Sequence, residues 1–211
     1  CLTELTGPAF YAPMWLWAQA FGAGTASLRL PALACSVAAP LLLLWRGHGD
    51  REVRMLWAAL VLLWLPAFPY AQDARPYPQM FLLGCCQAIA FARLLRGPDT
   101  RRAFAWTGVT ALLLLTHYST LVIGTCQGVA YLAMHRRRAL ATWPALACAL
   151  PVAGWGWMHL PFVLSITGGG GAGGGGLAPA ELAAVPTMMF GVGAVGAMVL
   201  GLIAASFAMP G

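Results

Sequence analysis

Long apolar runs alternate with short polar connections along most of this chain. Read with a window of about 19 residues, the sequence has such runs near 26–45, 55–71, 77–95, 104–134, 139–164 and 183–208. Several of them approach or exceed the ~18 apolar residues that mark a membrane-spanning helix. The pattern predicts an all-α fold, a polytopic bundle of transmembrane helices.

The positions of the few charged residues predict how this bundle is oriented in the membrane. Only 9% of the 211 residues are charged, against roughly 25% in soluble globular proteins. All twelve basic residues are arginines, and ten of them lie in three of the connections: Arg46, Arg51, Arg54, Arg93, Arg96, Arg101, Arg102, Arg136, Arg137 and Arg138. These clusters predict the cytoplasmic side by the positive-inside rule. They fit membrane orientation better than a stripe for nucleic acid, which we do not expect as a partner.

The run at 104–134 is too long for one span. The 33 residues between Arg102 and Arg136 would measure roughly 50 Å as one helix, whereas the hydrocarbon core is ~30 Å thick. Both flanks are basic, so a hairpin is expected, broken at the polar cluster 116–120. A short first arm would leave this turn below the outer membrane surface, where non-helical backbone needs surrounding protein or a watery cavity. Gly124 and Gly128 have the spacing of a helix-packing motif.

The rest of the chain predicts one membrane module. Residues 1–25 form an outer loop with a Trp-rich interfacial helix, and 26–164 form the membrane bundle. Residues 165–182 make a Gly-rich outer loop, and 183–208 form a further span. The first and last residues suggest a chain incomplete at both ends. None of the six cysteines forms a C-x-x-C pair, which favours packing over a zinc or redox site.

The sharpest candidate site lies at residues 72–78. Pro76 and Pro78 fit the first turn of the following helix, which places Asp73 and Arg75 at its amino end on the outer side. A helix amino end beside an arginine is suited to a phosphate. The alternative is that Asp73 caps the helix and pairs with Arg75 at the surface.

Three further candidates are Glu4, His117 and Tyr118. Glu4 precedes the aromatic segment at the water–lipid boundary, where an acid is either a base or a solvated charge. His117 and Tyr118 lie in the submerged turn, where polar groups are costly and usually face a functional cavity. A neutral histidine can also bond within a bundle without any chemistry. His159, near the outer end of a span, is predicted to be interfacial.

Four short motifs, in order along the chain, resemble a known enzyme family. They are Pro8 with Tyr11, the segment Ser27–Leu33, the segment Gln72–Tyr77 and the segment Leu115–Tyr118. Their order and spacing between spans resemble the multi-pass glycosyltransferases of the C superfamily. The family 39 type, with protein O-mannosyltransferases and bacterial lipid A and core-glycan transferases, is the most similar. The match covers most of residues 4–164.

The resemblance implies a membrane enzyme that transfers a sugar from a polyprenyl-phosphate carrier. The acceptor would be an extracytoplasmic glycan, lipid or protein, in the plasma (inner) membrane, with membrane lipids as surroundings. It implies Glu4, or an acid upstream, as general base and Asp73 as the second outer acid. Arg75, Tyr77, His117 and Tyr118 would bind substrate. The chain has Thr6-Gly7-Pro8 where relatives show His-Pro-Pro, so a divalent metal stays open and no other cofactor is indicated.

The groups that sugar transfer requires agree with these implied residue roles. Displacing a lipid phosphate from an anomeric carbon requires a base for the acceptor hydroxyl and positive groups for the charge on the leaving phosphate.

Two other classes of membrane protein remain open. A transporter or lipid flippase would use the submerged turn as a gate, although the halves show no clear internal repeat. A non-catalytic assembly subunit would account for the altered residues of the first loop.

Overall fold

The computed structural model describes residues 6–63, 71 and 73–168. The predicted span at 183–208, the Gly-rich stretch from 169 onward and Glu4 lie outside the described residues. Within them the chain is all-α, as predicted, with one isolated antiparallel bridge between Thr6 and His117. The helices are α1 (Pro8–Phe21), α2 (Thr25–Arg46), α3 (Arg51–Leu62), α5 (Tyr77–Arg96), α6 (Thr100–Thr116), η2 (Tyr118–Thr120), α7 (Leu121–His135), α8 (Arg137–Ala141), η3 (Trp143–Ala149) and α9 (Leu150–Gly168).

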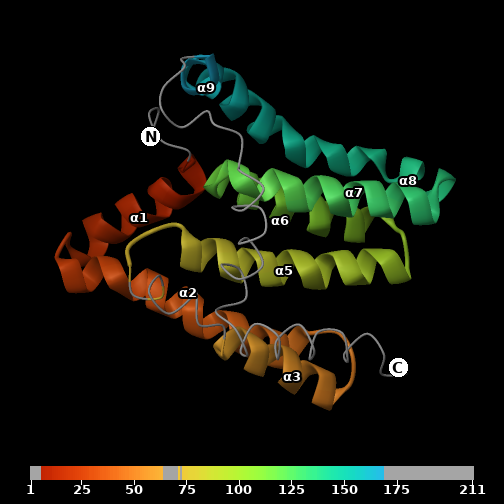
Figure 1. The fold of residues 1–211 in the computed structure, drawn as a ribbon, viewed down its shortest axis with the longest axis horizontal. Coiled ribbons are helices and arrows are strands. Elements are labelled where there is room, and N and C mark those ends of the chain that lie inside the picture. Colours follow the sequence, from red (N-terminus) through yellow and green to blue (C-terminus); the bar gives the residue numbers. More distant parts are fainter. Residues whose placement is uncertain (1–5, 64–70, 72, 169–211) are drawn as a thin grey trace, which may run out of the picture.

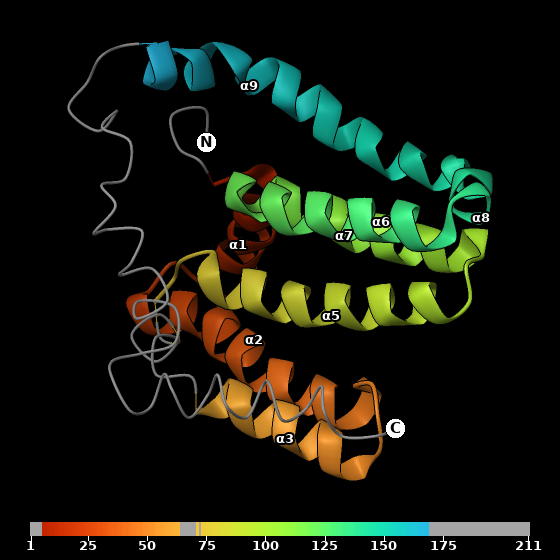
Figure 2. The same cartoon turned by 45° about the vertical axis from the view of Figure 1, so that its right-hand side comes forward.

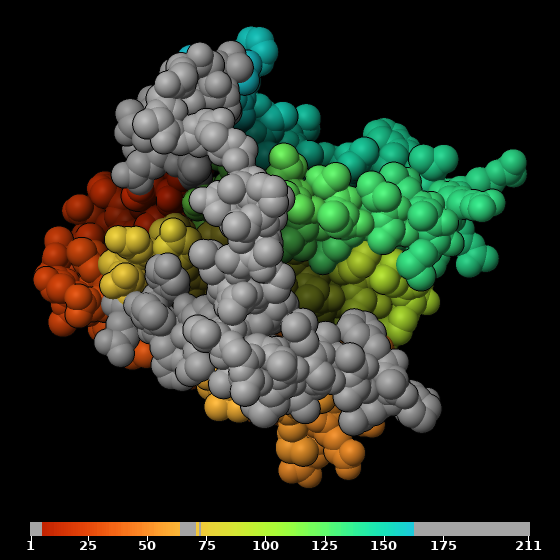
Figure 3. All heavy atoms as spheres, in the orientation of Figure 1, coloured from red at the N-terminus to blue at the C-terminus, as the bar shows by residue number. Residues whose placement is uncertain are grey.

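The longer helices lie side by side, with α2, α5, α6 and α7 running back and forth between two ends of the molecule (Figures 1 and 2). Residues of α1 and the beginning of α2 occupy one end, and residues around α8 occupy the other (Figure 3). Among the described residues, two helices are long and apolar enough to cross a membrane, namely α2 and α5.

The Arg-rich connections lie together. The links α2–α3, α5–α6 and α7–α8 are all at the same end in both ribbon views (Figures 1 and 2). Two of the helices that start there are capped by aspartate. Asp50 accepts from the backbone N–H of Val53 at 2.9 Å and Asp99 from that of Arg102 at 2.9 Å, which satisfies first-turn donors. We call this end of the bundle the basic end.

The predicted hairpin is present at the predicted break. Helix α6 ends at Thr116, the backbone forms one 3₁₀ turn, and α7 returns toward the basic end (Figure 1). A methyl group at Gly124 would lie 2.9 Å from Cγ2 of Thr110, and one at Gly128 would lie 3.6 Å from the Trp106 ring. The two glycines therefore face α6 and allow its close approach, as expected for this spacing.

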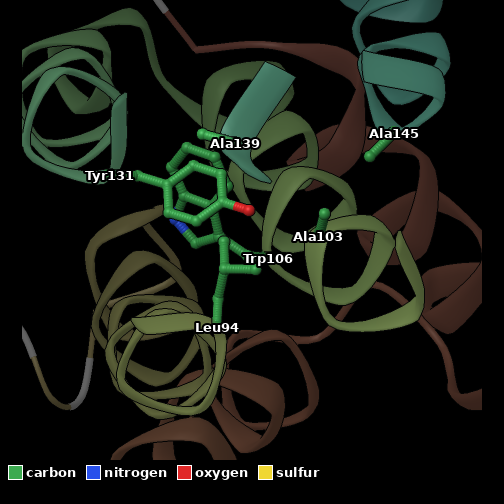
Figure 4. Close-up of a cluster of buried hydrophobic side chains, with 6 residues drawn as sticks. All are labelled: Leu94, Ala103, Trp106, Tyr131, Ala139 and Ala145. Atoms are coloured by element: carbon green, nitrogen blue, oxygen red, sulfur yellow. The ribbon is translucent and has the colours of Figure 1, made fainter. Parts of the chain in front are cut away.

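Helix α6 is the centre of the packing. The main buried cluster joins it to α5, α7, α8 and η3 through six side chains (Figure 4): Leu94, Ala103, Trp106, Tyr131, Ala139 and Ala145. Polar groups add to these contacts inside the bundle. Gln87 of α5, which is 1% exposed, donates to Thr110 at 2.9 Å, and the Trp106 indole donates to Gln127 of α7 at 2.7 Å. Buried polar groups that are bonded in this way fix the helices relative to each other.

The apolar run at 139–164 is not one continuous helix. It divides into α8, the 3₁₀ segment η3 and α9. Pro144 and Pro151 lie in this region and have no backbone N–H to donate to a helical carbonyl. The side chain of Thr107 in α6 donates to the carbonyl of Ala145 at 2.9 Å, so η3 is attached to the centre of the bundle.

Candidate functional site

Asp73 and Arg75 stand at the amino end of α5, as predicted. Pro76 precedes the helix and Pro78 lies in its first turn, where the missing N–H costs nothing. Nε of Arg75 is 3.8 Å from Oδ2 of Asp73, and the two side chains are 62% and 44% exposed. The N-cap residue of α5 is Pro76 and not Asp73, so in the predicted alternative the Asp73 cap is wrong, whereas the surface pair with Arg75 is confirmed. An exposed pair at this distance contributes little to stability, which leaves Arg75 accessible to an anion.

The segment before α1 is attached to the end of α6. The backbone N–H of Gly7 donates to the carbonyl of Thr116 at 2.9 Å, next to the bridge between Thr6 and His117. Gly7 is buried, and a Cβ at this position would collide with the carbonyl oxygen of Leu115. A residue with any side chain would push the two segments apart, so this close approach requires glycine.

Gln79, in the first turn of α5, connects the same two segments. Its Nε2 donates to the carbonyl of Ala9 at 2.8 Å and to Oγ1 of Thr116 at 3.4 Å. Thr116 is fully buried, and its hydroxyl donates to the carbonyl of Leu112 at 2.7 Å. The group Gly7, Gln79, Thr116 and His117 thus joins α1, α5 and α6 at one point, which we call the junction.

Arg75 lies beside the junction. It lines a cavity of about 20 Å³ together with Gln79, residues of α1, and Leu28, Pro31 and Ala32 of α2. The four segments that carry the family resemblance therefore meet at the end of the bundle opposite the basic end (Figure 1). The cavity has room for about one water molecule, so a larger ligand would have to bind on the open side, where Arg75 is exposed.

The imidazole of His117 is oriented by the turn that follows it. Its Nδ1 accepts from the backbone N–H of Ser119 at 3.2 Å and lies 2.9 Å from the Ser119 hydroxyl. Because Nδ1 accepts a hydrogen bond from the backbone N–H of Ser119, the neutral ring carries its own hydrogen on Nε2. The half-buried His117 thereby adds an N–H donor to the junction.

Tyr118, which follows His117 in the turn, contacts His159, and the sequence did not predict this pair. The Tyr118 hydroxyl is 3.0 Å from Nδ1 of His159 in α9, and the two rings stack at 5.4 Å. His159 is 1% exposed and packs against Trp155 and Phe162. Its predicted place near the membrane interface concerns its depth along the span and stays a prediction, whereas the burial of the ring among other side chains was not predicted. Its Nε2 is buried without a hydrogen-bond partner among the described residues.

Removing the Tyr118 hydroxyl tests this contact. Tyr118→Phe leaves both ring nitrogens of His159 without a partner and should lower the stability by about 1–3 kcal/mol, the usual cost of an unsatisfied buried group. His159→Phe and the double variant complete a double-mutant cycle, read out by thermal unfolding in detergent. A coupling of about 1 kcal/mol is expected; strictly additive losses would show that the two side chains do not interact.

Tyr77 and Tyr118 are the remaining residues that were predicted to bind substrate. Tyr77 opens α5 and is 39% exposed, whereas the Tyr118 hydroxyl is already held by His159, so a direct substrate contact of either tyrosine stays a prediction. In the described part of the chain no three His, Cys, Asp or Glu side chains gather where they could hold a metal ion.

Comparisons with protein-family models, with curated proteins and with solved structures find no match to this chain.

Proposed function

We propose that this chain is a multi-pass membrane glycosyltransferase that moves a sugar from a polyprenyl-phosphate carrier to an extracytoplasmic acceptor. The observation that carries the proposal is the junction. Segments near residues 7, 79 and 116 are far apart in the sequence, yet they are joined by hydrogen bonds of 2.9 and 2.8 Å, and Arg75 lies beside them. Converging polar groups of this kind, at one end of an apolar bundle, are typical of a ligand site.

The distribution of side chains supports insertion of the bundle with the junction outward. Large apolar side chains are exposed along three helices, as a lipid environment requires: Leu33, Val37 and Leu41 of α2, Val122, Ile123 and Val129 of α7, and Trp157 and Met158 of α9. The basic end would face the cytoplasm. Helix α6, with 17 residues, reaches ~25 Å, which is less than the ~30 Å core, so its turn would lie below the outer surface.

The proposed reaction uses the groups around Arg75. A base takes the proton of the acceptor hydroxyl, a new bond forms from that oxygen to the anomeric carbon, and the bond from this carbon to the lipid phosphate breaks. The leaving phosphate gains negative charge, which the Arg75 guanidinium and the Nε2–H of His117 would stabilise. Asp73 would hold Arg75 in place and orient the acceptor. Glu4, the proposed base, lies outside the described residues.

A transfer assay tests the proposal directly. The purified chain would be reconstituted in liposomes that contain a radiolabelled polyprenyl-phosphate hexose or pentose. We expect the label to appear in water or on an added acceptor, and heat-denatured protein serves as the control. Movement of the intact lipid between leaflets would favour the transporter class, and neither result would favour an assembly subunit.

A further inference from the structure

A second hollow lies at the basic end, between the last turns of α2 and α5 and the first turn of α6. Its volume is about 600 Å³, and its polar lining consists of Arg46, Arg93, Arg101, Arg102 and Asp99. Sites for small molecules commonly measure ~300–1,000 Å³, so the hollow is large enough for a phosphate group with its attached glycerol. We call it the basic pocket.

Two of these charged residues are already paired. Nε of Arg102 is 3.1 Å from Oδ2 of Asp99, and its guanidinium also donates to the carbonyl of Gly97 at 2.8 Å. Together they hold the α5–α6 turn. Arg46, Arg93 and Arg101 are exposed and form no ion pair with a described acid. Three positive charges therefore surround the pocket without a negative partner in this part of the protein.

The negative ends of the α2 and α5 dipoles explain why arginines occur at these positions. They do not explain the hollow between them, which several guanidinium groups border from three helices. A guanidinium group binds a phosphate oxygen pair in a fork, and several of them bind it more strongly than scattered surface charges do.

The other walls of the pocket are apolar. Leu42, Ile89 and Ala90 line it between the arginines and the middle of the helices. The neighbouring Leu41 and Leu44 of α2 are exposed. A free phosphate has no use for such walls, whereas a lipid needs a charged contact for its headgroup and an apolar one for the chains below it.

From this geometry we infer that the basic pocket binds the phosphate headgroup of an anionic membrane lipid, in the leaflet that meets the basic end. The inference requires that α2 and α5 enter a membrane, but it does not depend on any transfer reaction. Its occupant is a structural or regulatory lipid, held at the opposite end of the bundle from Arg75.

The test is lipid binding by native mass spectrometry. The purified chain in neutral detergent is titrated with short-chain phosphatidylglycerol, with phosphatidylcholine, and with free glycerol phosphate. Phosphatidylglycerol should bind at least tenfold more tightly than phosphatidylcholine. Glycerol phosphate at equal concentration should not displace it. Displacement at equal concentration would mean that the pocket takes a soluble phosphate, and equal binding of the two lipids would mean that no headgroup site exists.

A matched pair of variants locates the site. Arg93→Ala with Arg101→Ala removes two charges from the pocket and should weaken phosphatidylglycerol binding about thirtyfold, since each arginine near an anionic lipid contributes about fivefold. Arg137→Ala with Arg138→Ala removes the same charge from α8, outside the pocket, and should change binding less than about threefold. Equal losses in both variants would overturn the inference. Melting temperatures in neutral detergent check that both pairs fold.

Discussion

Replacing Arg75 with alanine should lower the rate of sugar transfer by about a hundredfold or more, the usual loss when one group that stabilises transition-state charge is removed. The fold should survive. The side chain is 62% exposed and its pair with Asp73 is long, at 3.8 Å, so its removal should change the free energy of unfolding by less than about 0.5 kcal/mol. The measurement is single-turnover transfer from a labelled polyprenyl-phosphate sugar, with thermal unfolding of the same preparation.

Arg29 provides the matched control for this experiment. It is also an exposed arginine, near the start of α2, and does not line the cavity beside the junction. Arg29→Ala should leave the transfer rate within about twofold, because the exposed Arg29 side chain borders neither the cavity beside the junction nor the basic pocket. Arg75→Lys should recover only part of the rate, since an ammonium group lacks the fork that binds two phosphate oxygens. Unchanged turnover in Arg75→Ala would contradict the proposed function.

Gly7→Ala should be among the most damaging single-methyl changes in the described part of this protein. The added Cβ would collide with the backbone oxygen of Leu115, and neither α1 nor α6 can move without breaking the Gly7–Thr116 hydrogen bond. Overpacking of this kind costs about 1–3 kcal/mol, and the apparent melting temperature should fall by about 2–12 °C for a chain of this length. Transfer should fall with it, because the junction separates.

Gly84 supplies the control for Gly7. It lies inside α5, and a methyl group there would meet no atom within 4 Å apart from its chain neighbours and the nearby backbone of its own helix. Gly84→Ala should raise stability by up to about 1 kcal/mol, the gain in helix propensity. The two substitutions add the same methyl group, so opposite signs in thermal unfolding would confirm that the close contact at Gly7 is responsible. Equal small effects would show that the segments before α1 and after α6 adapt without cost.

The sequence was sufficient for the elements that depend on local chemistry or on length. Pro76 and Pro78 predicted the start of α5, because proline is tolerated only in the first turn. The hairpin followed from the length of one apolar run and its polar break at 116–120. The small-residue spacing of Gly124 and Gly128 predicted a close helix contact, and both glycines do face α6.

The contacts of the site could not be predicted in the same way. Gln79 bonds to Ala9 across 70 positions, and Tyr118 to His159 across 41. Which residues face each other over such distances depends on how each helix is rotated. Helix α9 is apolar on nearly all sides, so its periodicity does not identify the buried face. The burial of His159 among the side chains of the bundle therefore could not be predicted from the sequence.

Helix α1 is attached at both of its ends. At its start, Gly7 bonds to Thr116, and at its end the indole of Trp17 donates to the carbonyl of Ser27 in α2 at 3.0 Å. Gly7 and Trp17 are ten residues apart, so α1 sets a distance of ~15 Å between these two attachments. One inserted residue would lengthen this spacer by only ~1.5 Å but would rotate one attachment by ~100° relative to the other. The tolerance of the bundle for changes in α1 is therefore set by rotation and length together, because seven added residues, close to two whole turns, would restore the rotation but lengthen the helix by ~10.5 Å.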